Sequence, residues 1–88
     1  MRHSFIDESW EDYLYWQVTN KNNLKRINEL IKDIKRNPFT GIGKPEPLKH
    51  KYKGCRSRRI DGEHRLIYQV RGDEIIILKC RFHYDGGI

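Results

Sequence analysis

The stretch SRRIDGEHRLIYQVRGDEIIILKCRF, residues 57–82, contains most of the β-sheet that the sequence predicts. Apolar and polar residues alternate in it before a run of four aliphatic residues, and the dipeptides Asp61-Gly62 and Gly72-Asp73 interrupt it. Segments of this kind, separated by such dipeptides, are typical of antiparallel hairpins. The pattern predicts a type I′ turn at Asp61-Gly62 and strands over residues 57–60, 64–70 and 75–82.

The register of the last hairpin decides which side chains face the core, because a slip of one residue exchanges the two faces of a strand. An odd register, from a three-residue loop at 71–73 or from one bulge, gives an almost wholly apolar face of Leu66, Tyr68, Val70, Ile76, Leu78, Cys80 and Phe82. The opposite face then carries Arg65, Ile67, Gln69, Ile75, Ile77, Lys79, Arg81 and His83. An even register would instead bury Arg65 among apolar side chains, which costs several kcal/mol unless the guanidinium is paired. We therefore expect the odd register, with Arg65 and His83 in one cationic concavity.

The first half of the chain predicts a short strand over residues 3–6 and then two helices. Asp7 is the predicted N-cap of the first helix, which ends near Val18, and Thr19-Asn20 offers the cap of the second. The second helix must end by Asn37, because Pro38 disfavours helical geometry in the residue before it. These helices are expected to form an antiparallel pair packed on the sheet in one domain, residues 1–88, with Trp10 and Trp16 as packing residues.

The net charge of +6 is unevenly distributed along the chain. Residues 44–88 carry eleven Lys and Arg against six Asp and Glu, whereas residues 1–43 carry seven against six. Between Pro47 and Ile60 there is no acid, and the cations are Lys49, Lys51, Lys53, Arg56, Arg58 and Arg59. Such clustering favours a nucleic-acid surface, although a solvated basic face has the same composition.

The two cysteines, Cys55 and Cys80, lack C-x-x-C spacing, and the sequence has no apolar stretch long enough for a membrane span. We therefore expect a reduced, cytoplasmic protein, with Cys80 in the core and Cys55 more exposed. The four histidines supply no metal-ligand spacing, so neither a metal nor a cofactor is expected, and His50 and His64 are expected to be solvated.

Three residues could together cleave RNA without a metal. Glu46, held between two prolines, could remove the proton of a ribose 2′-hydroxyl; Arg65 could stabilise charge on the phosphate; and His83 could protonate the departing 5′-oxygen. Tyr84 could stack on a base or bond a phosphate, and Arg59 could hold another phosphate. Each of these residues also has a purely structural reading: a loop acid, a strand-end aromatic, a surface cation or a residue near the chain end.

Five segments resemble one family of proteins: SWEDYLYWQ, INELIKDIKRNPF, GKPEPLKH, SRRIDGEHRLIYQV and CRFHY. Together they are similar to the YoeB family of bacterial toxins, in the RelE/ParE superfamily. The resemblance implies an α+β fold with two N-terminal helices on a twisted antiparallel sheet. It also implies a ribosome-dependent messenger-RNA endonuclease that acts at the ribosomal A site, is inhibited by an acidic YefM-like antitoxin, and can form a homodimer.

By motif, the resemblance assigns the base to Glu46, the transition-state arginine to Arg65, the acid to His83 and the terminal aromatic to Tyr84. It places Arg59, Lys49 and His50 on a basic RNA-facing surface, to which the charge pattern adds Lys51 and Arg58. The segment GCRS departs from the family pattern, as does the tail over residues 85–88. A non-catalytic RNA- or ribosome-binding module, or a gyrase-directed toxin like those of the ParE branch, stays open as an alternative.

Overall fold

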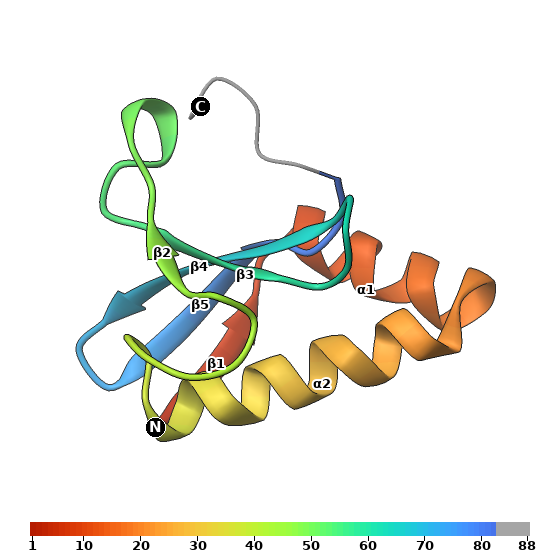
Figure 1. The fold of residues 1–88 in the computed structure, drawn as a ribbon, viewed down its shortest axis with the longest axis horizontal. Coiled ribbons are helices and arrows are strands. Elements are labelled where there is room, and N and C mark those ends of the chain that lie inside the picture. Colours follow the sequence, from red (N-terminus) through yellow and green to blue (C-terminus); the bar gives the residue numbers. More distant parts are fainter. Residues whose placement is uncertain (83–88) are drawn as a thin grey trace.

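A computed structural model describes residues 1–82, in which two helices cover one face of a five-stranded sheet (Figure 1). The elements in chain order are β1 (Arg2–Phe5), α1 (Asp7–Thr19), α2 (Lys21–Arg36), β2 (Glu46–Pro47), the short 3-10 helix η1 (His50–Tyr52), β3 (Arg56–Arg59), β4 (Arg65–Arg71) and β5 (Glu74–Lys79). The strand order is β1-β5-β4-β3-β2. The predicted α+β class is confirmed, and β2 to β5 pair in antiparallel fashion, whereas β1 pairs with β5 in parallel.

Helix α2 follows its sequence signals closely. Asn20 caps it, because the side-chain oxygen of Asn20 accepts a hydrogen bond from the Asn23 amide at 3.1 Å. The helix ends at Arg36, one residue before Asn37 and Pro38, as predicted. Its apolar stripe, Ile27, Leu30, Ile31 and Ile34, is buried against the sheet.

The start of α1 differs from the prediction. Ile6 rather than Asp7 is the N-cap residue. The Ser9 hydroxyl accepts a hydrogen bond from the Ile6 amide at 3.0 Å and donates one to the Ile77 carbonyl oxygen at 2.6 Å. Ser9 therefore fixes the first turn of the helix to β5, and Asp7 is left as the first helical residue.

The register between β4 and β5 is even next to the turn and changes at a bulge. Val70 lies opposite Ile75 and Tyr68 opposite Ile77, so both isoleucines face the core, contrary to the prediction for them. A bulge between Ile67 and Tyr68 then shifts the pairing so that Ile67 lies opposite Lys79. Beyond the bulge, Leu66 and Cys80 share the core face as predicted, while Ile76 and Leu78 lie outside the main core. The expected bulge exists, but it lies at the far end of the hairpin from the turn.

The predicted type I′ turn at Asp61-Gly62 is wrong. The connection between β3 and β4 spans residues 60–64, and the Ile60 amide donates to the His64 carbonyl oxygen at 2.9 Å. The Oδ1 atom of Asp61 accepts hydrogen bonds from the amides of Glu63 and His64, at 2.8 and 2.7 Å. Because the Asp61 side chain organises the loop, Gly62 does not adopt the positive φ that a type I′ turn requires.

The main core contains Trp16, whose indole Nε1 donates to the Cys80 carbonyl oxygen at 2.7 Å. Trp16 and Cys80 are therefore packing residues, as expected. Trp10 stacks on Tyr13 but is 45% exposed.

Cys55 is buried rather than exposed, in a second apolar cluster with Leu48 and Ile67. No helix within residues 1–82 is long and apolar enough to cross a membrane.

Candidate functional site

Strand pairing places Glu46, Arg59 and Arg65 on the same face of the sheet. Ser57 lies opposite both Glu46 and Ile67, and side chains of opposed residues share a face. Arg59 is two residues beyond Ser57 and lies opposite Arg65, so both arginines belong to this face. It is the face away from α1 and α2, because Ile67 packs in the second apolar cluster and not among the helices.

Glu46 is exposed in β2, at the edge of the sheet. The loop before it is fastened to β3, since the Arg59 amide donates to the Gly43 carbonyl oxygen at 2.7 Å. Gly43 has a φ of 80°, and a Cβ atom there would lie 2.8 Å from Leu30 Cδ2, so the loop can approach the core this closely only with glycine. The segment after Glu46 is held by a bond from the Leu48 amide to the Cys55 carbonyl oxygen at 3.0 Å. Glu46 is thus an exposed carboxylate on an anchored backbone.

Arg65 is only 9% exposed and begins β4. Its Nη1 atom donates to the carbonyl oxygens of Asp61 and His64, at 3.0 and 3.2 Å. Neither bond uses a carboxylate, and within residues 1–82 the guanidinium has no ion pair. Within the described residues, the positive charge of Arg65 is therefore held in place by neutral backbone groups.

Lys79 lies opposite Ile67 and so shares the sheet face of Arg65, as predicted, but the charged groups of Lys79 and Arg81 contact residues of α1. Lys79 Nζ lies 3.8 Å from a carboxylate oxygen of Glu8 in α1, and the Arg81 guanidinium lies over the Tyr15 ring at 3.5 Å. The Cys80 amide between them donates to Asp12 Oδ2 at 3.0 Å. The bulge and these contacts direct the end of β5 toward α1.

Arg58 is not exposed, contrary to the prediction from the charge pattern, which placed it on a basic surface. The residue is fully buried, because Arg58 lies opposite Leu66 on the core face of the sheet. Its guanidinium donates five hydrogen bonds, to Asp33 Oδ2 (2.6 Å), the carbonyl oxygens of Asn37 (2.8 Å), Thr40 (3.2 Å) and Ile42 (3.0 Å), and the Tyr68 hydroxyl (3.2 Å). Arg58 therefore holds the loop that follows α2 and leads to Glu46.

The cations of residues 49–51 are exposed around η1. Lys49 precedes the first residue of this short helix, His50 has a positive φ of 56°, and Lys51 Nζ lies 5.5 Å from the centre of the Tyr52 ring. The second apolar cluster, formed by Leu48, Cys55 and Ile67 with Tyr52 and Leu78 packed against it, lies beneath this segment. The cluster thus ties the basic segment to the same sheet face as Glu46.

His64 is a residue of the site that the sequence pattern missed. It is not solvated: its side chain is 12% exposed, its ring meets Trp16 edge to face, and Nδ1 accepts a hydrogen bond from the Phe82 amide at 2.7 Å. The Arg65 amide also donates to the Phe82 carbonyl oxygen, at 3.1 Å. The backbone N–H and C=O groups of Phe82 are therefore both hydrogen-bonded, and Phe82 has a φ of 64°. These bonds fix the backbone at the residue directly before His83. His83 and Tyr84 themselves lie outside the described residues.

The chain is similar to known proteins both in sequence and in fold. A family model described as YoeB-like toxin of bacterial type II toxin-antitoxin system matches residues 5–84. The chain is 58% identical over 84 residues to Toxin YoeB of Escherichia coli K12, covering 96% of this chain and 100% of that protein. The structure of the YoeB dimer from Staphylococcus aureus matches with a TM-score of 0.88 at 47% identity, and the YoeB-YefM complex from the same species with 0.87 at 48%. Each of these structural matches covers 96% of this chain and 98% of the other.

Proposed function

The chain belongs to the family of YoeB-like toxins of bacterial type II toxin-antitoxin systems, and on that premise we propose that it is a ribosome-dependent messenger-RNA endonuclease. This proposal rests on the strand register, which puts Glu46, Arg59 and Arg65 on one face of the sheet. With strands about 4.8 Å apart and residues about 3.3 Å apart along each, the Cα atoms of Glu46 and Arg65 are separated by roughly 12 Å. That spacing leaves room for a phosphate and its flanking sugars between the two side chains.

In the proposed reaction, the Glu46 carboxylate takes the proton of a ribose 2′-hydroxyl, and the 2′-oxygen attacks the adjacent phosphorus. The bond from phosphorus to the 5′-oxygen breaks, and His83 gives its proton to the departing oxygen. Arg65 stabilises the charge that develops on the phosphoryl oxygens. The products are a 2′,3′-cyclic phosphate and a 5′-hydroxyl, and no metal is needed for any proton transfer.

Arg59, Lys49, His50 and Lys51 are proposed to hold the RNA backbone, since all four are exposed beside Glu46. Tyr84 is proposed to complete the site as an aromatic contact to the substrate. The substrate is messenger RNA in the ribosomal A site, which explains how an exposed site could still be selective: the ribosome would present the strand in a reactive geometry.

We also propose that an acidic YefM-like antitoxin inhibits this chain and that the free chain forms a homodimer. A Staphylococcus aureus YoeB has been solved both as a dimer and in complex with YefM. A basic face flanking Glu46 suits an acidic partner, because electrostatic attraction speeds association and the partner would cover the substrate site.

The test is primer extension on a message translated in a reconstituted system. We expect Glu46→Ala and His83→Gln each to reduce codon-linked cleavage by about 100-fold or more. Glu29→Ala is the matched control, since Glu29 is also an exposed glutamate but lies on α2. Undiminished cleavage in both site variants would refute the assigned roles.

The outcome also separates this proposal from the alternatives. A non-catalytic ribosome-binding module would bind ribosomes without producing cut message. A gyrase-directed toxin would stay toxic after His83→Gln, because its action would not require a base, a cation and an acid in one site.

A further inference from the structure

His64 contacts both Arg65 and the last described residue of the chain. Its carbonyl oxygen accepts a hydrogen bond from Arg65 Nη1 at 3.2 Å, and its ring nitrogen Nδ1 accepts one from the Phe82 amide at 2.7 Å. Arg65 is the residue proposed to stabilise the phosphate, and Phe82 directly precedes His83, the proposed acid. One residue therefore links the proposed arginine to the segment that carries the proposed acid.

The hydrogen bond from Phe82 also fixes where the His64 ring carries its proton. A ring nitrogen that accepts a hydrogen bond from an amide has no proton of its own, so Nδ1 is unprotonated and the single proton of the neutral ring lies on Nε2. Nε2 lies 3.6 Å from Oε1 of Glu63, which is too long for a hydrogen bond but favours an N–H that points toward the carboxylate. The ring is thus a neutral acceptor directed at Phe82.

The core holds the His64 ring in this orientation. The ring packs edge to face on Trp16, with ring centres 4.7 Å apart and an interplanar angle of 79°. Trp16 is itself fixed, because it is buried and its Nε1 donates to the Cys80 carbonyl oxygen at 2.7 Å. Only 12% of the His64 side chain is exposed. The position of the acceptor is therefore set by the main core.

Phe82 has a backbone conformation that needs such support. Its φ of 64° lies in the left-handed region, which is unfavourable for a residue with a Cβ atom. Two hydrogen bonds offset this cost: the amide donates to His64 Nδ1, and the carbonyl oxygen accepts from the Arg65 amide at 3.1 Å. The Arg81 guanidinium also lies 4.4 Å from the centre of the Phe82 ring. Loss of the His64 acceptor removes one of the two bonds and favours an extended Phe82, which changes the direction in which the chain leaves this residue.

We propose that His64 is a positioning residue for RNA cleavage, because its neutral ring holds Phe82 in the conformation that directs the following residue, the proposed acid His83, toward the phosphate bound by Arg65. His64 touches no reacting atom in this role and acts only through His83. The inference rests on the proposed function, since an acid that takes part in no cleavage needs no positioning.

Two substitutions of His64 differ in where they leave an acceptor. Asparagine places its amide oxygen close to the position of Nδ1, whereas glutamine places it one bond further out, near Nε2. In single-turnover cleavage of a translated message, we expect His64→Gln to lower the rate at saturating protein by about 10- to 100-fold. His64→Asn should retain most of the rate, and the protein concentration that gives half-maximal rate should be unchanged in both. His3→Gln, the same substitution at an exposed histidine of β1, is the matched control and should cut like the wild type.

A double variant separates positioning from a merely structural role. If His64 acts only through His83, then His64→Gln/His83→Gln should cut no more slowly than His83→Gln alone, because the acid is already absent. Losses that multiply in the double variant would overturn the proposal. Equal losses in His64→Asn and His64→Gln would also overturn it, since both remove the ring from Trp16 and only one removes the acceptor from Phe82.

The same assay distinguishes failure of this inference from failure of the proposed function. If the wild type leaves the message intact, the proposed function is wrong and the positioning role is lost with it. If the wild type cuts and His64→Gln cuts equally fast, only the positioning role is wrong. Should His64→Gln not fold, nitrogen-15 spectroscopy of the wild-type imidazole gives the answer: we expect Nδ1 to show the chemical shift of an unprotonated ring nitrogen and Nε2 that of a protonated one. A protonated Nδ1 would overturn the proposal.

Discussion

Arg58 and Arg59 are neighbours in β3, yet their side chains lie on opposite faces of the sheet. Arg58 faces the core and donates to Asp33 at 2.6 Å and to three loop carbonyl oxygens, whereas Arg59 is exposed on the face of Glu46. A charge count treats the two residues alike, because it contains no information about the face. The pairing with β4 is what separates the buried, structural Arg58 from the exposed Arg59.

Alanine substitution should separate the two roles. Arg58→Ala removes one partner of a buried ion pair and leaves several loop carbonyl groups without donors, so we expect the free energy of unfolding to fall by about 3–5 kcal/mol. Arg59→Ala should change it by about 0.5 kcal/mol or less while reducing RNA cleavage. Urea unfolding followed by far-ultraviolet circular dichroism measures the first quantity, and primer extension measures the second. Equal stability losses would contradict this assignment.

Asp33 makes the same contact sensitive to acid. Hydrogen bonds from the Arg58 side chain and the Ile42 amide lower the pKa of Asp33 from its ordinary value of 3.8. A lowered carboxyl pKa gives stability that is present above the unfolded pKa and is lost as pH falls through the folded pKa. The difference in unfolding free energy between the wild type and Asp33→Asn should therefore be constant above about pH 5 and shrink below about pH 4. Urea titrations across this range test it, and a difference that stays constant to pH 3 would contradict it.

The loop between β3 and β4 is organised by the side chain of Asp61. Asp61 accepts bonds from the amides of Glu63 and His64 through Oδ1, and from Asn23 Nδ2 of α2 through Oδ2 at 3.0 Å. Burial raises the pKa of Asp61, but these hydrogen bonds outweigh it and leave the pKa lowered. The loop is thus fixed both within itself and to a helix, and it supplies two carbonyl oxygens to Arg65.

This organisation predicts unequal effects of Asp61→Ala and Gly62→Ala. The first variant loses three hydrogen bonds at a largely exposed site, so unfolding free energy should fall by about 1–2 kcal/mol. The second should change it by about 0.5 kcal/mol or less, because nothing lies within 4 Å of a Cβ atom at Gly62 and its φ is not positive. Thermal and urea unfolding of both variants provide the comparison. A larger loss at Gly62 would indicate the type I′ turn instead.

The elements that could be predicted correctly from the sequence are those whose ends are set by local signals. The α2 helix could be placed because its cap at Asn20 and its stop before Pro38 act within one turn of the helix. The bulge between Ile67 and Tyr68 could not be located, since its position is set by contacts that β5 makes with α1. The parallel pairing of β1 with β5 joins residues more than 70 positions apart, for which periodicity carries no signal.

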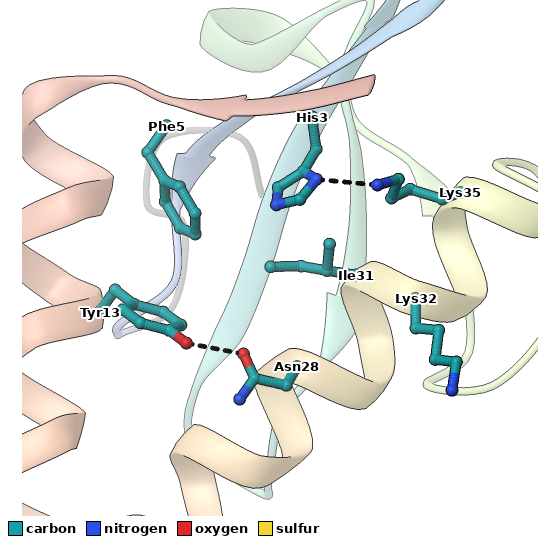
Figure 2. A pocket seen from close by; sticks show the side chains of 7 residues that line it. All are labelled: His3, Phe5, Tyr13, Asn28, Ile31, Lys32 and Lys35. Carbon is teal, nitrogen blue, oxygen red and sulfur yellow. Dashed lines mark hydrogen bonds between the residues drawn. The ribbon is translucent and has the colours of Figure 1, made fainter. Parts of the chain in front are cut away.

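The two sides of the sheet have different compositions. The helical side holds the main core and a hollow lined by His3, Phe5 and Tyr13 (Figure 2), and the other side holds Glu46, Arg59 and the exposed cations around η1. Glu46, Arg65 and Arg59 could be proposed as site residues from the sequence, but the roles of Arg58 and His64 could not. Both depend on which element lies opposite them, and His64 is recognised only through its contacts with Trp16 and Phe82.

The division into two sides predicts how salt affects RNA binding. Each cation that contacts a phosphate releases a counterion, so the slope of log affinity against log salt for single-stranded RNA should fall by about 0.7 for each contact removed. Lys49→Ala and Arg59→Ala should each produce that change and weaken binding of all sequences alike. Lys21→Ala, at an exposed position on α2, should leave the slope unchanged. Anisotropy titrations with labelled oligouridine at several salt concentrations measure these slopes. If Lys21→Ala lowered the slope as much as Arg59→Ala, binding would follow net charge and not the face that carries Glu46.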